Sequence, residues 1–217
     1  MNDNMSEWIL KAKNCGIDLS NLHQDKEKMW KDLKSRNLPV PKTYTIKADE
    51  ITGKRVQKIF QKTNCFCRLI PKNKDAIRPY NLKLTSVDEF QKFCSKYNLS
   101  EYTIQLLEKQ NITHSGTAII KKEFSIIEVV KGDGPNMTHG LKIPITIVIR
   151  RGKIKYVHKQ PTVIQKNIIN KVKNYVKNKQ GYYEFDVQNN KTILFRNYQP
   201  KNTPWTNIEE TWNSKSV

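Results

Sequence analysis

The sequence has few acidic residues for its length, and this shortage determines its charge. Its 217 residues hold 39 Lys and Arg but only 20 Asp and Glu, which gives a formal net charge of +19. A chain this basic favours polyanionic partners such as nucleotides, RNA or DNA. Lys, Asn and Ile are abundant together, as in proteins translated from AT-rich genes, so the positive charge has both a functional and a compositional explanation.

The sequence also lacks paired cysteines and long apolar runs. Its four cysteines include no CxxC pair, and Cys65 and Cys67 have no second Cys or His pair with which to complete a zinc site. We therefore expect buried free thiols. The first 20 residues contain no apolar signal segment, and no run reaches the length of a membrane span. These absences predict a cytoplasmic protein without a membrane partner.

The spacing of apolar residues predicts an α+β fold. Helices are expected at residues 26–36, 53–62, 86–97 and 161–179, with Ser86 as the N-cap of the third. The helix residues expected to face inward are Met29, Trp30, Leu33, Val56, Ile59, Phe60, Phe90, Phe93, Cys94, Tyr97, Ile164, Ile168, Val172, Tyr175 and Val176. Strands are expected at residues 43–46, 65–70, 117–120, 124–130 and 154–158, in the ITIVI run, and in a final hairpin. The length suits one functional unit of two packed lobes. We divide it into an N-terminal part with a smaller lobe, residues 1–104, and a C-terminal lobe, residues 105–217.

Residues 115–140 hold four of the eight glycines, Gly116, Gly132, Gly134 and Gly140. At a glycine the backbone can adopt a positive φ or let a ligand approach closely. Two apolar, β-branched runs lie between the first two glycines and predict a hairpin of two strands. The second run carries a single carboxylate, Glu128, and a buried carboxylate requires a partner such as a metal or a base.

The final predicted hairpin contains a second group of candidate site residues. Glu184 and Asp186 are the only acids between residues 141 and 200, and their spacing places both on one face of a strand. Two carboxylates in a basic region suit a Mg²⁺ ion that bridges nucleotide phosphates. Charge alone favours the other explanation, in which they neutralise nearby lysines. A two-residue loop after this strand would point Glu184 and Arg196 to opposite faces, whereas an odd-length loop would place them on one face.

An arginine lies in the middle of the strand predicted at residues 65–70. Arg68 either contacts phosphate groups or forms a surface ion pair. The segment that follows, PKNKDAIRPYN, contains no glycine, so it lacks the composition of a flexible glycine-rich phosphate loop. Lys72 in this segment is a candidate for phosphate contact through its side chain.

Three segments, in order, resemble the ATP-grasp superfamily, and within it the ATP-binding domain of pyruvate phosphate dikinase and phosphoenolpyruvate synthase. DKEKMWKDLKSRNLPVPKTYTI is similar to the family's entry helix and VP strand. SGTAIIKKEFSIIEVVKGDGPNMTHG is similar to its SGxA strand and glycine-rich turn, with Gln105 in the place of the hinge glutamine. YEFDVQNNKTILFRN is similar to its closing hairpin, with Glu184 on a metal-binding glutamate and Arg196 on a glutamine. Arg68 matches the arginine of a strand that contacts ATP phosphates.

The resemblance implies two lobes of antiparallel sheet and helices with a nucleotide cleft between them. It also implies an enzyme that binds ATP and Mg²⁺ and catalyses phosphoryl transfer or ATP-dependent ligation to an unknown acceptor. Arg68 and Arg196 would be its catalytic residues. The implied metal ligands are Glu128, Glu184 and Asp186. The implied cofactor-binding residues are Lys28, Arg68, Lys72, Gln105, Leu107, Glu128, Gly132, Gly134 and Arg196.

The chain departs from the family's pattern at several positions. Pro135 stands where the family usually has a glutamate, and Leu69 and Ile70 replace two serines. These departures leave open a degenerate ATP-grasp fold that has lost catalysis. A further alternative is a basic RNA-binding module without turnover, in which residues 142–179 contact backbone phosphates.

Overall fold

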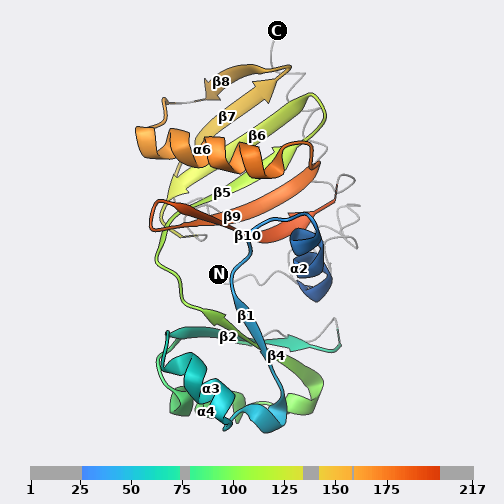
Figure 1. Ribbon diagram of the computed structural model, residues 1–217, viewed down its shortest axis with the longest axis vertical. Coiled ribbons are helices and arrows are strands. Elements are labelled where there is room, and N and C mark those ends of the chain that lie inside the picture. Colours follow the sequence, from blue (N-terminus) through green and yellow to red (C-terminus); the bar gives the residue numbers. More distant parts are fainter. Residues whose placement is uncertain (1–25, 74–78, 134–141, 158, 201–217) are drawn as a thin grey trace, which may run out of the picture. The chain divides into compact units, whose positions relative to one another are not determined.

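The computed structural model describes residues 26–73, 79–133, 142–157 and 159–200 (Figure 1). The chain divides into two compact units. The large unit comprises residues 1–40 and 112–217, and the small unit comprises residues 41–111. The sequence-based division at residue 105 instead falls inside a strand, β4 (Tyr102–Glu108), which is hydrogen-bonded on both sides within the small unit. Each unit combines one antiparallel sheet with helices, which confirms the predicted α+β class.

The small unit is a four-stranded sheet in the order β1-β4-β2-β3, with every pair antiparallel. Its other strands are β1 (Thr43–Ile46), β2 (Cys65–Pro71) and β3 (Tyr80–Leu84). Its helices are α3 (Lys54–Phe60) and α4 (Val87–Cys94), with short 3₁₀ turns η2 (Ala48–Glu50) and η3 (Leu99–Glu101). Ser86 caps α4 by accepting a hydrogen bond from the Glu89 backbone N–H, as the sequence predicts.

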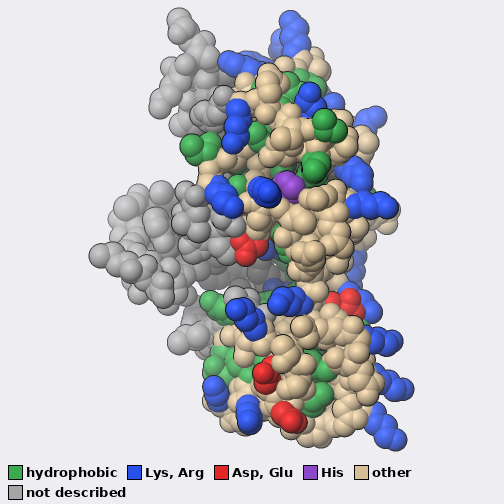
Figure 2. Space-filling model, turned by 90° about the vertical axis from the view of Figure 1, so that its left-hand side faces the viewer, with side chains coloured by type: hydrophobic (Ala, Val, Ile, Leu, Met, Phe, Trp, Pro, Cys, Tyr) green, Lys and Arg blue, Asp and Glu red, His purple; other side chains and the backbone are tan. Residues whose placement is uncertain are grey.

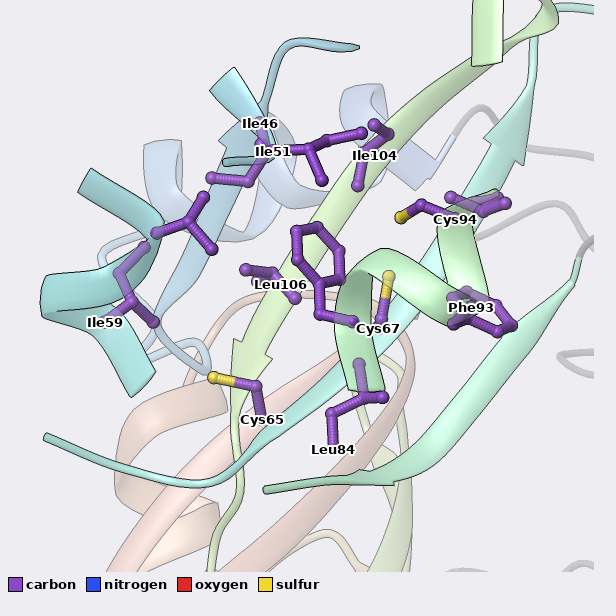
Figure 3. Close-up of a cluster of buried hydrophobic side chains, with 13 residues drawn as sticks. Ile46, Ile51, Ile59, Cys65, Cys67, Leu84, Phe93, Cys94, Ile104 and Leu106 are labelled. Carbon is purple, nitrogen blue, oxygen red and sulfur yellow. The ribbon is translucent and has the colours of Figure 1, made fainter. Parts of the chain in front are cut away.

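The core of the small unit forms where α3 and α4 cover one face of this sheet (Figure 3). Phe90 is fully buried in this core, together with Val56, Ile59, Phe93 and Cys94, which were also predicted to face inward. Cys65, Cys67 and Cys94 are buried free thiols, which confirms that prediction for the described cysteines. Burial raises the pKa of Cys65 to about 11, so this thiol stays protonated and unreactive near neutral pH.

The large unit is a six-stranded antiparallel sheet in the order β10-β9-β5-β6-β7-β8. Its strands are β5 (Ile112–Ile120), β6 (Phe124–Lys131), β7 (Ile145–Arg150), β8 (Lys153–Val157), β9 (Gly181–Gln188) and β10 (Thr192–Gln199). Helix α6 (Val163–Val176) crosses one face of the sheet, and α2 (Lys26–Ser35) packs against β10 (Figure 1). We call the face under α6 the helix face and the opposite face the polar face.

Helix α6 covers the sheet with a narrower apolar stripe than its sequence predicts. The buried residues are Ile168, Ile169, Val172 and Val176. Ile164 and Tyr175 were expected to face inward, but they are 45% and 38% exposed. The prediction was wrong for Ile164, since the buried residues of α6 begin only at Ile168. Tyr175 sets its ring edge-on to Phe195, with the ring centroids 5.9 Å apart. Among the described residues, no helix is long and apolar enough to cross a membrane.

Helix α2 and the segment after it close the β10 edge of the sheet. Met29, Trp30 and Leu33 of α2 are buried, as the helical spacing predicts. Arg36 donates hydrogen bonds to the Tyr183 hydroxyl, at 3.2 Å, and to the Tyr198 hydroxyl. The Phe195 backbone N–H donates to the Pro39 carbonyl at 2.7 Å, so this strand has a backbone partner on its outer side. The edge is thereby protected from pairing with another chain.

Gly116 on β5 is required by the packing of the helix face. A Cβ at this position would lie 2.2 Å from the Glu128 carbonyl oxygen and 2.3 Å from Phe185 Cζ. We predict that Gly116→Ala lowers the free energy of unfolding by about 3 kcal/mol or more, because neither the β6 backbone nor the Phe185 ring has room to shift. Gly152→Ala, in a hairpin turn with open space around it but φ of +79°, should cost only about 1 kcal/mol. Urea unfolding of the two variants measures both values, and equal losses would contradict this account.

His114, on the helix face, makes stability depend on pH. It is 7% exposed, and burial, with the positive charge of Lys131, lowers its pKa from the ordinary 6.5. The unfolded chain therefore binds a proton at His114 more readily than the folded chain, so stability falls as the pH drops below about 6.5. We predict that the free energy of unfolding of His114→Gln falls less than that of the wild type between about pH 7.5 and pH 5, because the variant lacks this titrating group. Parallel pH profiles of unfolding in the two proteins would contradict this, since the other histidines are common to both.

Candidate functional site

Strand β9 places two carboxylates on the polar face of the large unit. Tyr183 and Phe185 point to the helix face and are fully buried. The alternate residues, Glu184 and Asp186, therefore point to the opposite face, as their spacing predicts. Because β9 lies between β5 and β10, side chains from both neighbouring strands can contact these carboxylates.

Asp186 is held in a buried network. It is 2% exposed, and its Oδ1 accepts a hydrogen bond from Ser115 Oγ at 2.7 Å. Ser115 Oγ also lies 3.1 Å from the carbonyl oxygen of Gly132, where β6 has just ended. One hydroxyl thus ties the carboxylate on β9 to the beginning of the glycine-rich turn. Gly132 has a φ of 109°, a conformation that favours glycine.

Arg196 forms an ion pair with the same carboxylate. Its Nε lies 2.8 Å from Asp186 Oδ2, but the N–H is not aimed at the oxygen, so the contact is electrostatic and not an aligned hydrogen bond. The β9–β10 loop has three residues, since Gln188 pairs with Thr192, and Arg196 is the extra residue of a β-bulge. The odd loop length places Arg196 on the same face as Glu184, which resolves the alternatives left open by the sequence.

Burial and charge act in opposite directions on Asp186. Burial raises the pKa of Asp186 above its ordinary value, while Arg196 and Ser115 favour the charged form. The nearby carboxylates of Glu184 and Asp133 add to the increase. A cation placed beside these carboxylates would therefore relieve both their mutual repulsion and the cost of burial.

Glu184 is oriented by two donors. Its Oε1 accepts hydrogen bonds from the Tyr182 hydroxyl at 3.2 Å and from Asn197 Nδ2 at 3.1 Å. Asn197 pairs with Glu184 across the strands, and Tyr182 lies two residues before it on the same face. Within the described part of the chain, the other oxygen, Oε2, has no hydrogen-bond partner.

Glu128 lies on the same face but is only half-buried. It accepts hydrogen bonds from Thr117 at 3.2 Å and from Thr146 at 3.1 Å. Thr117 pairs with Glu128 on one side and with Glu184 on the other. A polar row therefore crosses five adjacent strands, and its members are Thr146, Glu128, Thr117, Glu184 and Asn197. Its two acids are separated by one threonine.

The small unit holds the other candidate residues. Arg68 Nε donates to Gln105 Oε1 at 2.9 Å, and the two residues pair across β2 and β4. Both point away from the helix-covered core, as does Leu107, which is buried. Lys72 donates from Nζ to the Ser100 carbonyl at 2.6 Å.

The structure thus sorts the candidate residues into two groups. Glu128, Glu184, Asp186, Arg196 and, through Ser115, Gly132 share one region of the large unit. Arg68, Gln105 and Leu107 share one sheet face of the small unit. Lys28 is exposed on α2, and Gly134 lies outside the described residues, as does Pro135.

Sequence reasoning missed the uncharged part of the site. Ser115, Thr117, Tyr182 and Asn197 hold the acids in place, yet single hydroxyl and amide residues in strands carry little signal of their own. The i, i+2 spacing of Ser115 and Thr117 does indicate a shared face. Their contact with Asp186 and Glu128 depends on the register between strands, which the sequence does not determine.

No protein-family model matches the sequence, and no curated protein matches it. The structure is similar to D-alanine-D-alanine ligase from Coxiella burnetii, with a TM-score of 0.45 and 12% identity over 88% of this chain and 52% of the ligase. For D-alanyl-alanine synthetase A from Vibrio cholerae the TM-score is 0.48 with 9% identity, over 97% of this chain and 68% of that protein. For a RiPP-associated ATP-grasp ligase from Chryseobacterium gregarium, solved with ADP and a leader and core peptide, the TM-score is 0.44 with 12% identity, over 80% and 51%. The chain spans about half the length of the first and third of these proteins.

Ser115 tests whether the buried network stabilises the large unit. We predict that Ser115→Ala lowers the free energy of unfolding by about 1–3 kcal/mol, because the buried Asp186 carboxylate and the Gly132 carbonyl lose the single hydroxyl donor that lies between them. Ser125→Ala is the matched control, since this half-buried serine on β6 has no side-chain hydrogen bond among the described residues. Chemical unfolding measures both variants, and equal stability of the two would show that the network contributes nothing.

Proposed function

We propose that the polar face of the large unit binds ATP together with Mg²⁺ and that the protein uses the nucleotide for phosphoryl transfer or ATP-dependent ligation. The observation that carries this proposal is the pair of β9 carboxylates, Glu184 and Asp186, beside the cation of Arg196. Phosphoryl transfer depends mainly on positioning and on charge neutralisation, and this arrangement supplies both signs of charge on one rigid strand pair.

The acidic side chains of this site suit Mg²⁺ better than they suit a metal whose ligands all come from the protein. Among the described residues, no group of three His, Cys, Asp or Glu side chains converges on one point. Mg²⁺ typically takes one or two carboxylates and completes its shell with water and substrate phosphates. Glu184 and Asp186 would hold the ion, while Glu128, separated from Glu184 by Thr117, would add negative charge to the same face. The ion would neutralise charge on the phosphate oxygens.

The two arginines are proposed to contact phosphate. Arg196 is fixed at Asp186 on one side, and its side chain remains 34% exposed, so the guanidinium can meet an anion from solvent. In the small unit, Gln105 orients Arg68 through the hydrogen bond to Nε. Lys28 and Lys72 would add positive charge, and Leu107 would contribute apolar contact.

The acceptor belongs to one of two chemical classes. A carboxylate acceptor would form an acyl phosphate and lead to ligation. A nucleophile on a small molecule or on another protein would retain the phosphoryl group. In both cases the work of the chain's own residues is to hold the phosphates and neutralise their charge.

We predict that ATP with Mg²⁺ raises the melting temperature. A ligand that binds only the folded state stabilises it by mass action, and a concentration of about 100 times Kd should raise the midpoint by about 5–10 °C. Glu184→Gln and Asp186→Asn should abolish the part that depends on Mg²⁺, because each removes a carboxylate charge. Differential scanning fluorimetry at moderate salt, with ATP alone and ATP with Mg²⁺, measures the shift.

Matched variants separate this site from general anion binding. Glu123→Gln removes a carboxylate from the turn between β5 and β6, where it pairs with Arg151 in an exposed position, and should keep the full shift. Arg68→Gln should reduce the shift with ATP if the small unit contributes to phosphate binding. A shift that sulfate reproduces, or one that all variants share, would refute the proposed site.

A further inference from the structure

Residues 141–183 contain eleven Lys and Arg but no Asp or Glu. An even spread of twenty acids over 217 residues would place about four in a stretch of this length. A general enrichment in lysine would not remove acids from one stretch alone. The uneven distribution therefore points to a requirement for positive charge in this part of the chain.

The structure displays this charge on β7, β8 and α6. Figure 2 shows one face of the molecule, on which Lys and Arg side chains are far more frequent than acidic side chains. Helix α6 contacts the sheet with Ile168, Ile169, Val172 and Val176, so its remaining surface is free to face solvent. The exposed polar residues of α6 are Lys166, Asn167, Asn170, Lys171, Lys173 and Asn174, followed by Lys177.

Three of these lysines form one stripe. At 3.6 residues per turn, Lys166, Lys173 and Lys177 fall within about 40° of one another around the helix axis, at separations of about 10 and 6 Å. Within the described part of the chain their ammonium groups have no ion-pair or hydrogen-bond partner. Lys173 and Lys177, at i and i+4, repel each other slightly in the free protein. The negative charges of a bound polyanion would attract both lysines and so offset this repulsion.

We propose that the outer surface of α6 binds the phosphate backbone of a nucleic acid. Lysine ammonium groups supply the charge, and the interleaved asparagines supply amide donors to phosphate oxygens. An anionic membrane fits less well because Ile168, Ile169, Val172 and Val176 are already buried against the sheet. The exposed Ile164 and Tyr175 lie about 160–180° around the helix axis from Lys166, so they could not enter a membrane that the lysine stripe contacts. The surface lies on the face opposite to Glu184 and Asp186, so this inference does not rest on the proposed nucleotide site.

Binding is measured by fluorescence anisotropy with a fluorescein-labelled single-stranded RNA of about 20 nucleotides, and with DNA of the same sequence, between about 50 and 200 mM KCl. The variant replaces Lys166, Lys173 and Lys177 by Gln. It should bind about tenfold or more weakly, and the slope of log K against log salt should fall in magnitude by about 2, since each phosphate contact contributes about 0.7.

The control variant replaces Lys54, Lys58 and Lys62 by Gln. These exposed lysines lie on and just after α3 in the small unit, and the change in net charge is the same. It should bind like the wild type, and all three proteins should melt at similar temperatures. Equal weakening in both variants, no binding of either nucleic acid, or binding only to phosphatidylserine vesicles or poly-glutamate would overturn the inference. A preference for RNA or for DNA would identify the source of the phosphate.

Discussion

The strict alternation of side chains along β9 is the constraint on which the large unit depends. Tyr183 and Phe185 fill the core under α6. Because successive side chains of a strand point to opposite faces, Glu184 and Asp186 must lie on the other face. A shift of one residue in register would bury two carboxylates among aromatic rings and expose the rings. The same packing that stabilises the sheet therefore also positions the acids, and the absence of a side chain at Gly116 makes room for the Phe185 ring.

A buried carboxylate needs compensation, and the neighbouring strands supply it. Ser115 from β5 and Arg196 from the bulge in β10 contact the two oxygens of Asp186. The bulge matters because it turns Arg196 and Asn197 toward one face, so that each serves a different carboxylate on β9. The irregularity of β10 is thus part of how the charges are arranged.

Much of the fold follows from local patterns in the sequence, whereas the arrangement of the site does not. Helical spacing located α2, α3 and α4, and alternation located most strands, because burial of one face is a local property. The polar row depends on which residue of β5 lies opposite Glu128 and Glu184, and that register comes from packing across the sheet. The prediction for Ile164 was wrong for a similar reason: its helical spacing is that of an inward residue, but which turns of α6 are buried depends on tertiary packing.

The large unit is assembled from two separate parts of the chain, with the small unit inserted between them. Helix α2 packs against β10, and Arg36, directly after the helix, donates hydrogen bonds to Tyr183 and Tyr198, which lie 147 and 162 residues further along the chain. During synthesis the small unit, which is continuous in sequence, can therefore fold before β9 and β10 exist, while α2 must wait for both strands. Until then its residues Met29, Trp30 and Leu33, which are buried in the folded protein, remain exposed, so α2 presents an apolar surface that can aggregate during synthesis.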